Sequence, residues 1–282
     1  MNTKLTIQLA LLLAVVLAEA KQTNAQTPPN MALIPPGTFT MGDTFNEGST
    51  EELPMHTVYT SAFYMDKYEV TKALWDEVYQ WATNHGYSFD NIGSWYNGVN
   101  YGKGPDHPVL AVNWFDCIKW CNARSEKEAR VPAYYTGATQ TTVYRSGRVA
   151  VQNDWVKWNA NGYRLPTEAE WEKAARGGVS QHRFPWSDAD IITHSRANYN
   201  SDTLNAYDIS PTRDFHPTFA VGGYAYTSPS GYFAPNGYAL YDMAGNVWEW
   251  CWDRYSSTYY TLNYETPLPS TFPHTKNTHS FL

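Results

Sequence analysis

The 282-residue chain has few cysteines, few charged residues and no cluster of basic side chains. Three cysteines cannot all pair with one another, and only 17% of the residues are charged. A formal net charge of −7 argues against a nucleic-acid-binding surface. The chain also lacks a Gly-x-Ser-x-Gly motif, a phosphate-binding loop and a repeat of fixed period. These absences argue against several common classes of enzyme and scaffold protein.

The first 25 residues have the pattern of a signal peptide. An apolar stretch at residues 5–17 follows a lysine, and Ala-Glu-Ala at residues 18–20 fits a cleavage site, with residues 23–25 as a second candidate. The apolar stretch is shorter than the roughly 20 residues of a membrane-spanning helix, so a retained anchor is the less favoured interpretation. We expect an exported chain, periplasmic or secreted, that begins at Lys21 or Gln26 and has no membrane association.

Signals for regular secondary structure are sparse, although 16% of the residues are aromatic. Thr71, Asn113 and Thr167 each stand where an N-cap would precede apolar residues at helical spacing. The third signal is the most complete, because Glu170 lies at the capping-box position after Thr167. Short strand-like segments surround these three helices. The pattern predicts a single α+β domain with little regular secondary structure.

Three tryptophans occur at every second position between residues 248 and 252: Trp248, Trp250 and Trp252. Alternate residues of a β-strand point to the same face, so we expect the three indoles on one buried face of a strand. The alternative is that aromatic residues form a surface for stacking against sugars.

Two longer blocks resemble one known family. Residues 162–178 read Gly-Tyr-Arg-Leu-Pro-Thr-Glu-Ala-Glu-Trp-Glu-Lys-Ala-Ala-Arg-Gly-Gly. Residues 236–253 read Asn-Gly-Tyr-Ala-Leu-Tyr-Asp-Met-Ala-Gly-Asn-Val-Trp-Glu-Trp-Cys-Trp-Asp. In this order the blocks resemble the formylglycine-generating enzymes, also called sulfatase-modifying factors. The resemblance covers residues 31–260 and implies an irregular C-type-lectin-like fold. It also implies descent from an oxidase that uses copper and oxygen to convert a cysteine to formylglycine in sulfatase-type polypeptides.

The resemblance further implies a calcium site in the second block. The matching positions are the side chains of Asp242 and Glu249 and the backbone carbonyls of Gly245 and Val247. Oxygen ligands from a tight, glycine-containing loop suit calcium. The alternative is a capped turn that carries ordinary surface acids.

A second calcium site of the family is matched only in part. Asn198 and Tyr199 fit one half of it, and Tyr224 fits a carbonyl position in the other half. Gly222 stands where a carboxylate is expected, which removes the main charge that would balance a divalent cation. We therefore do not expect this site to form unless another aspartate substitutes. Two aspartates are candidates for that role: Asp208 and Asp214.

The family's copper-binding cysteine pair has no counterpart in this sequence. That pair would follow the tryptophan block, where residues 261–282 form a divergent tail, so we expect the domain to be incomplete at its C-terminal end. Cys117, Cys121 and Cys251 match neither member of the pair, and a disulfide between the last two stays open. We accordingly expect no catalytic residue and no bound copper.

Two functions remain open at this point. The first is an exported, monomeric and inactive relative of the formylglycine-generating enzymes, with a sulfatase-type polypeptide or another exported protein as its partner. The second is a non-catalytic lectin-like module that binds protein or carbohydrate.

Overall fold

The computed structural model describes residues 28–93 and 103–254. The expected signal peptide, residues 1–25, and the expected tail, residues 261–282, lie outside the described residues. The elements in chain order are β1 (Met31–Ile34), β2 (Gly37–Met41), the 3₁₀-helix η1 (Thr50–Glu52), β3 (His56–Thr60), β4 (Phe63–Asp66), α1 (Lys72–Thr83), α2 (Trp114–Lys127), the 3₁₀-helix η2 (Asn153–Trp155), α3 (Glu168–Ala175), β5 (Asn200–Ser201), β6 (Asp214–Phe215), β7 (Ala220–Val221) and β8 (Tyr224–Ala225).

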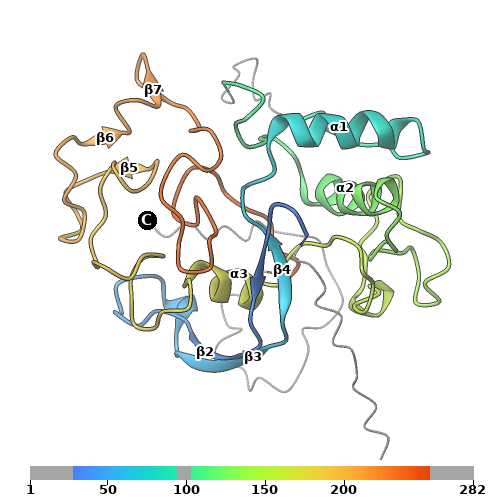
Figure 1. Ribbon diagram of the computed structural model, residues 1–282, viewed down its shortest axis with the longest axis horizontal. Coiled ribbons are helices and arrows are strands. Elements are labelled where there is room, and N and C mark those ends of the chain that lie inside the picture. The colour runs from blue at the N-terminus through green and yellow to red at the C-terminus, as the bar shows by residue number, and fades with distance from the viewer. Residues whose placement is uncertain (1–27, 94–102, 255–282) are drawn as a thin grey trace, which may run out of the picture.

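The strands pair in twos and form no large sheet within the described residues. Strand β1 pairs antiparallel with β4, and β2 pairs antiparallel with β3. Two shorter antiparallel pairs, β5 with β6 and β7 with β8, lie on the side of the molecule away from α1 and α2 (Figure 1). Long loops connect these pairs, so the expectation of an irregular α+β domain is confirmed.

All three predicted helix starts are confirmed. The Thr71 hydroxyl accepts a hydrogen bond from the amide of Leu74 at the start of α1, and Asn113 caps α2 in the same way. At α3 the Thr167 hydroxyl accepts from the Glu170 amide while the Glu170 carboxylate accepts from the Thr167 amide. These caps satisfy amides that have no partner within the helix. No helix within residues 28–93 and 103–254 has both the length and the apolar character needed to traverse a bilayer.

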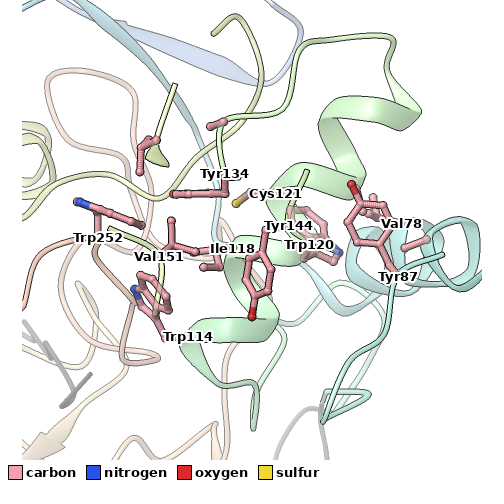
Figure 2. Packing of buried hydrophobic residues seen from close by; sticks show 14 of the residues in the cluster. Val78, Tyr87, Trp114, Ile118, Trp120, Cys121, Tyr134, Tyr144, Val151 and Trp252 are labelled. Carbon is pink, nitrogen blue, oxygen red and sulfur yellow. The ribbon is translucent and has the colours of Figure 1, made fainter. Parts of the chain in front are cut away.

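The largest core surrounds α2, and Figure 2 shows Val78, Ile118 and Trp120 among its buried side chains. The rings of Trp75 and Trp120 stack with their centroids 5.4 Å apart. The Trp120 indole N–H also donates a hydrogen bond to the Trp75 carbonyl at 3.2 Å. This pairing buries a large aromatic area and leaves no orphaned indole donor on Trp120.

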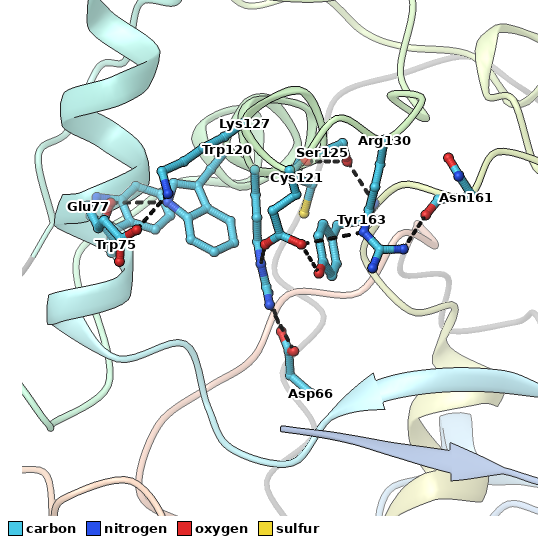
Figure 3. A network of polar contacts seen from close by, with 12 residues as sticks. Asp66, Trp75, Glu77, Trp120, Cys121, Ser125, Lys127, Arg130, Asn161 and Tyr163 are labelled. Carbon is cyan, nitrogen blue, oxygen red and sulfur yellow. Dashed lines mark hydrogen bonds and ion pairs between the residues drawn. The ribbon is translucent and has the colours of Figure 1, made fainter. Parts of the chain in front are cut away.

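Polar contacts fix the ends of these elements to one another. Arg124 of α2 forms an ion pair with Asp66 at the end of β4, and its guanidinium lies 3.8 Å from the centre of the Tyr163 ring (Figure 3). Lys173 of α3 is buried, and its ammonium group donates to Pro35 O, Gly37 O and the hydroxyl of Thr60. The Arg124 guanidinium and the Lys173 ammonium group each have polar protein partners that replace the water lost on burial.

The predicted row of three buried tryptophans is wrong in part. Trp252 is buried and stacks on Tyr134, and Trp250 is half-buried, but Trp248 is 59% exposed. Residues 242–253 form a loop instead of a strand. Residues 248–252 take part in none of the strand pairs of the described chain, so no sheet face covers all three indoles.

This correction leads to a test with two matched substitutions. We expect Trp252→Ala to lower the free energy of unfolding by about 3–5 kcal/mol, the usual effect of emptying an aromatic core position. Trp248→Ala should change it by less than about 0.5 kcal/mol, as at most surface positions. Urea denaturation of both variants measures the difference. Equal losses would show that Trp248 also belongs to the core.

Candidate functional site

A groove of about 580 Å³ opens beside the tryptophan loop. Three segments that are distant in sequence form its main walls: residues 109–112, residues 198–200 and residues 246–250. Its lining is mostly apolar, and Glu249 is the only charged side chain among the described residues that line it. The volume lies within the usual range for ligand-binding clefts, roughly 300–1,000 Å³.

Hydrogen bonds connect the three walls. The Trp250 indole donates to Val112 O at 3.1 Å, which ties residues 246–250 to residues 109–112. The Asn246 amide donates to Asn198 O at 2.8 Å, which ties the same loop to the third wall. Trp248 lines the groove, and its exposed ring is available for contact with a ligand. The three walls of the groove are thus joined by hydrogen bonds, and Trp248 is the more exposed of two exposed aromatic residues, with Phe215, in its lining.

The loop from Asp242 to Glu249 requires its glycine. Gly245 has a φ of +84°, and a Cβ at this position would lie 2.5 Å from Asn198 O. Any other residue would strain the backbone and displace the neighbouring wall. The side chain of the next residue, Asn246, accepts from the Ser228 amide at 2.8 Å and donates to Glu69 Oε2 at 2.7 Å. The loop is thus held from both sides.

Of the two carboxylates expected to bind calcium, that of Asp242 belongs to a buried residue and that of Glu249 to a half-buried one. Asp242 Oδ2 accepts from the Gly231 amide, whereas its Oδ1 atom has no hydrogen-bond partner among the described residues. Glu249 Oε2 accepts from the Trp171 indole at 2.9 Å. Burial raises the pKa of Asp242 to about 6 and that of Glu249 to about 6. Two desolvated acids, one of which has an oxygen without a hydrogen-bond partner, suit a bound cation.

A third acid, Glu69, lies in the same region, and the sequence analysis did not identify it. Its Oε1 atom is buried without a partner among the described residues. Burial, with the negative charges of Asp242 and Glu249, raises the pKa of Glu69 well above its usual value. A lone glutamate just before a helix cap has no spacing pattern that marks it as a site residue, so only the three-dimensional structure reveals it.

The kind and number of oxygen atoms on the loop determine which metal ion it could bind. Asp242, Gly245, Val247 and Glu249 all lie on one loop, and their assignment as calcium ligands stays a prediction. Across residues 28–93 and 103–254, no three His, Cys, Asp or Glu side chains converge closely enough to hold a metal by themselves. A cation here would need backbone carbonyl oxygens as well, which calcium accepts readily.

Two residues of the second expected calcium site, Asn198 and Tyr199, make hydrogen bonds to other residues of the protein. The Asn198 side-chain amide donates to Tyr226 O and to Asn246 Oδ1. Tyr199 O contacts the His194 ring at 3.2 Å, and Tyr224 lies in β8 with 61% of its surface exposed. These contacts leave no carboxylate hydrogen-bonded to the Asn198 side chain within the described residues.

The two aspartates that could have replaced the missing carboxylate have other positions. Asp208 accepts from the Tyr199 hydroxyl and the Asp202 amide and pairs with Arg213. Asp214 lies in β6, opposite Ser201 of β5. The expectation that this site does not form stays a prediction.

All three cysteines are free thiols. Cys121 lies in the core between α1 and α2, whereas Cys251 lies in a separate core against α3, so the disulfide left open between them is not formed. Burial raises the pKa of Cys121 to about 12 and that of Cys251 well above its usual value. Cys117 is half-buried, and desolvation of its thiol raises its pKa well above the usual value. None of the three lines the groove.

The comparison with known families decides the relationship. The family described as the sulfatase-modifying factor enzyme 1-like domain matches residues 16–278. The chain belongs to this family. It is 34% identical over 253 residues to the formylglycine-generating enzyme of Streptomyces coelicolor, which covers 86% of this chain and 72% of the enzyme.

Another relative is the chaperone protein LppX of Paenibacillus barcinonensis, with 37% identity over 209 residues. That match covers 71% of this chain, and the chain spans only 65% of LppX. Among solved structures, CarF has a TM-score of 0.59 and 26% identity, with 80% of each chain covered. PvdO from Pseudomonas aeruginosa has a TM-score of 0.53 over 89% of this chain and 78% of its own; its 24% identity supports the fold alone.

Proposed function

We propose that these 282 residues form an exported, monomeric protein of the formylglycine-generating enzyme family that binds a polypeptide segment and does not oxidise it. The observation that carries this proposal is the groove, which has an exposed Trp248 and no thiol in its lining. A sulfatase-type polypeptide is the proposed ligand, since the related enzymes act on such substrates.

The chemistry of the groove supports an extended peptide as its occupant. Asn200 is an exposed residue of the groove wall, where its side-chain amide can meet the peptide backbone. A large, half-rigid indole such as Trp248 contributes contact area at a low conformational cost, as in many binding hot spots. The name of LppX, a chaperone protein, agrees with a role in handling polypeptides.

The cysteines do not fit the copper chemistry of the related enzymes. Copper(I) requires thiolates that converge on one ion. Cys121 and Cys251 lie in different cores, and burial keeps all three thiols protonated at neutral pH. These residues therefore supply neither a copper site nor a nucleophile, and we derive no oxidation step for them.

The first prediction concerns catalysis. Incubation of the purified chain with copper(I), oxygen and a Cys-x-Pro-x-Arg peptide should yield no formylglycine, as read by mass spectrometry. The Streptomyces coelicolor enzyme under the same conditions is the positive control. Aldehyde formation that disappears in Cys121→Ser or Cys251→Ser would contradict the proposal and reveal an active site at that thiol.

The second prediction concerns binding in the groove. Trp248→Ala should weaken the affinity for the same peptide by about tenfold or more, as expected for loss of an aromatic hot spot. Tyr59→Ala, which removes an exposed ring on β3, is the matched control and should leave the affinity unchanged. Fluorescence anisotropy with a labelled peptide measures both.

Carbohydrate is the second candidate ligand, because the exposed Trp248 ring beside asparagine amides is also suited to stacking on a sugar. A labelled oligosaccharide in the same assay distinguishes the two. Binding of the sugar but not of the peptide, lost in Trp248→Ala, would favour the lectin-like function over the one proposed.

Calcium is the proposed ion of the acidic loop, held by the carboxylates of Asp242 and Glu249 and the carbonyls of Gly245 and Val247. The unpartnered Oδ1 atom of Asp242 supports this assignment. Bound calcium would neutralise the buried acids and thereby stabilise the loop that forms one wall of the groove.

The third prediction follows from this assignment. Calcium should raise the melting temperature of the parent chain above its value in chelator, and Glu249→Gln should abolish most of that rise while it retains an acceptor for Trp171. Glu77→Gln, an exposed change on α1, is the control and should respond to calcium as the parent does. Differential scanning calorimetry measures the shift. A parent chain that is indifferent to chelation would remove the calcium assignment.

A further inference from the structure

We propose that an intramolecular amide bond joins the Nζ atom of Lys119 to the Cγ atom of Asn91, formed with Asp116 as the acid–base group. The three side chains meet where the segment that follows α1 lies against α2. None of them lines the groove. The inference is independent of the proposed function, because it concerns a covalent modification of the fold itself.

Helix α2 places Asp116 and Lys119 on one face. The two residues are three apart in a helix, so their side chains are neighbours, and Lys119 Nζ lies 3.3 Å from Asp116 Oδ1. Both residues are 0% exposed. The loss of water by two buried charges offsets much of their attraction, so stability alone does not explain this ion pair.

The Asp116 carboxylate bridges Lys119 and Asn91. Its Oδ2 atom accepts from Asn91 Nδ2 at 2.9 Å and from the Asn91 backbone amide at 3.1 Å. Its Oδ1 atom, which is the one near Lys119, also accepts from the Asp90 amide at 2.9 Å. One carboxylate thus holds the amine at one oxygen and the side-chain amide at the other, while the backbone bonds fix the loop that carries Asn91.

The Lys119 amine is placed to act as a nucleophile. Its Nζ atom has no hydrogen-bond partner among the described residues, and the Phe89 ring centre lies 5.5 Å away. The other buried lysine, Lys173, donates to three oxygen atoms. Proton transfer from Lys119 to Asp116 gives an amine with a lone pair, and two neutral groups cost less to bury than two ions.

The reaction balances with these three side chains alone. Asp116 takes one proton from the Lys119 ammonium group, and the lone pair of Nζ then attacks Cγ of Asn91. Asp116 delivers its proton to Nδ2, to which it is already hydrogen-bonded, and the Cγ–Nδ2 bond breaks as ammonia leaves. The carboxylate then takes the second proton of Nζ, which completes the new amide. No oxidant, reductant or other co-reactant is required.

The bond gives the fold a covalent cross-link between α2 and the loop after α1. All three cysteines are free thiols, so no disulfide does this. A cross-link between residues 91 and 119 restricts the unfolded chain and thereby stabilises the folded one, in the way that a disulfide does.

Mass spectrometry of the purified full-length chain tests the bond. Trypsin does not cut after an acylated lysine, so residues 73–103 and 104–124 should be recovered as one branched peptide. Its mass should be about 17 Da below the sum of the two separate peptides, which is the mass of one ammonia. Fragmentation should place the link between Asn91 and Lys119. Recovery of unlinked peptides from the folded chain, after overnight incubation, overturns the proposal.

Three variants assign the roles. Lys119→Met removes the nucleophile and Asp116→Asn removes the acid–base group at nearly constant size, so both should yield unlinked peptides. Lys127→Met changes another lysine of α2, which pairs with Glu77, and should keep the link. A link that persists in Asp116→Asn overturns the role of Asp116, and a link lost in Lys127→Met overturns the assignment to Lys119.

The melting temperature gives an independent readout. Asn91→Ala changes a half-buried loop residue and leaves the ion pair of α2 in place, so it also serves if Lys119→Met does not fold. It should yield the unlinked peptides and melt on the order of 5–10 °C below the parent, the effect expected for loss of a cross-link. A parent that is unlinked and melts with Asn91→Ala shows that these residues make hydrogen bonds only.

Discussion

The side-chain amide of Asn246 holds together three segments that lie far apart in the chain. It bonds to Glu69, 177 residues away, to Asn198, 48 residues away, and to the backbone of Ser228. Each bond is buried or partly buried, where an unpaired amide would be costly to leave. Because the helices and the paired strands are short, such side-chain bonds take the place that long sheet ladders have in other folds.

The same loop contributes to two properties of the molecule. Its backbone and acids form the proposed cation site, and residues 246–250 form one wall of the groove. We therefore expect that a change in the charge of Asp242 or Glu249 also shifts the wall that residues 246–250 form. Desolvation raises the pKa of both Asp242 and Glu249, which means that their charged forms are less favourable here than in water.

Local signals in the sequence predicted the parts of the fold that local interactions determine. Thr71, Asn113 and Thr167 were identified as helix caps because a cap needs only residues within one turn. Trp248 was misplaced because the alternation rule assumes a strand that is covered by a sheet neighbour, and residues 248–252 belong to a loop outside the strand pairs of the described chain. Glu69 was missed because its position beside the acidic loop depends on packing between Tyr68 and Tyr241, which no spacing along the chain encodes.

The indole bond from Trp250 to Val112 has a consequence for how the groove can vary. Gly245 has no room for a larger side chain. The Asn246 side chain is hydrogen-bonded to Glu69 and Ser228, and the Trp250 indole joins two walls of the groove. Trp248 has none of these structural roles, since most of its surface is exposed to solvent. Trp248 is therefore the position at which a substitution can change ligand specificity without breaking the hydrogen bonds that join the walls of the groove.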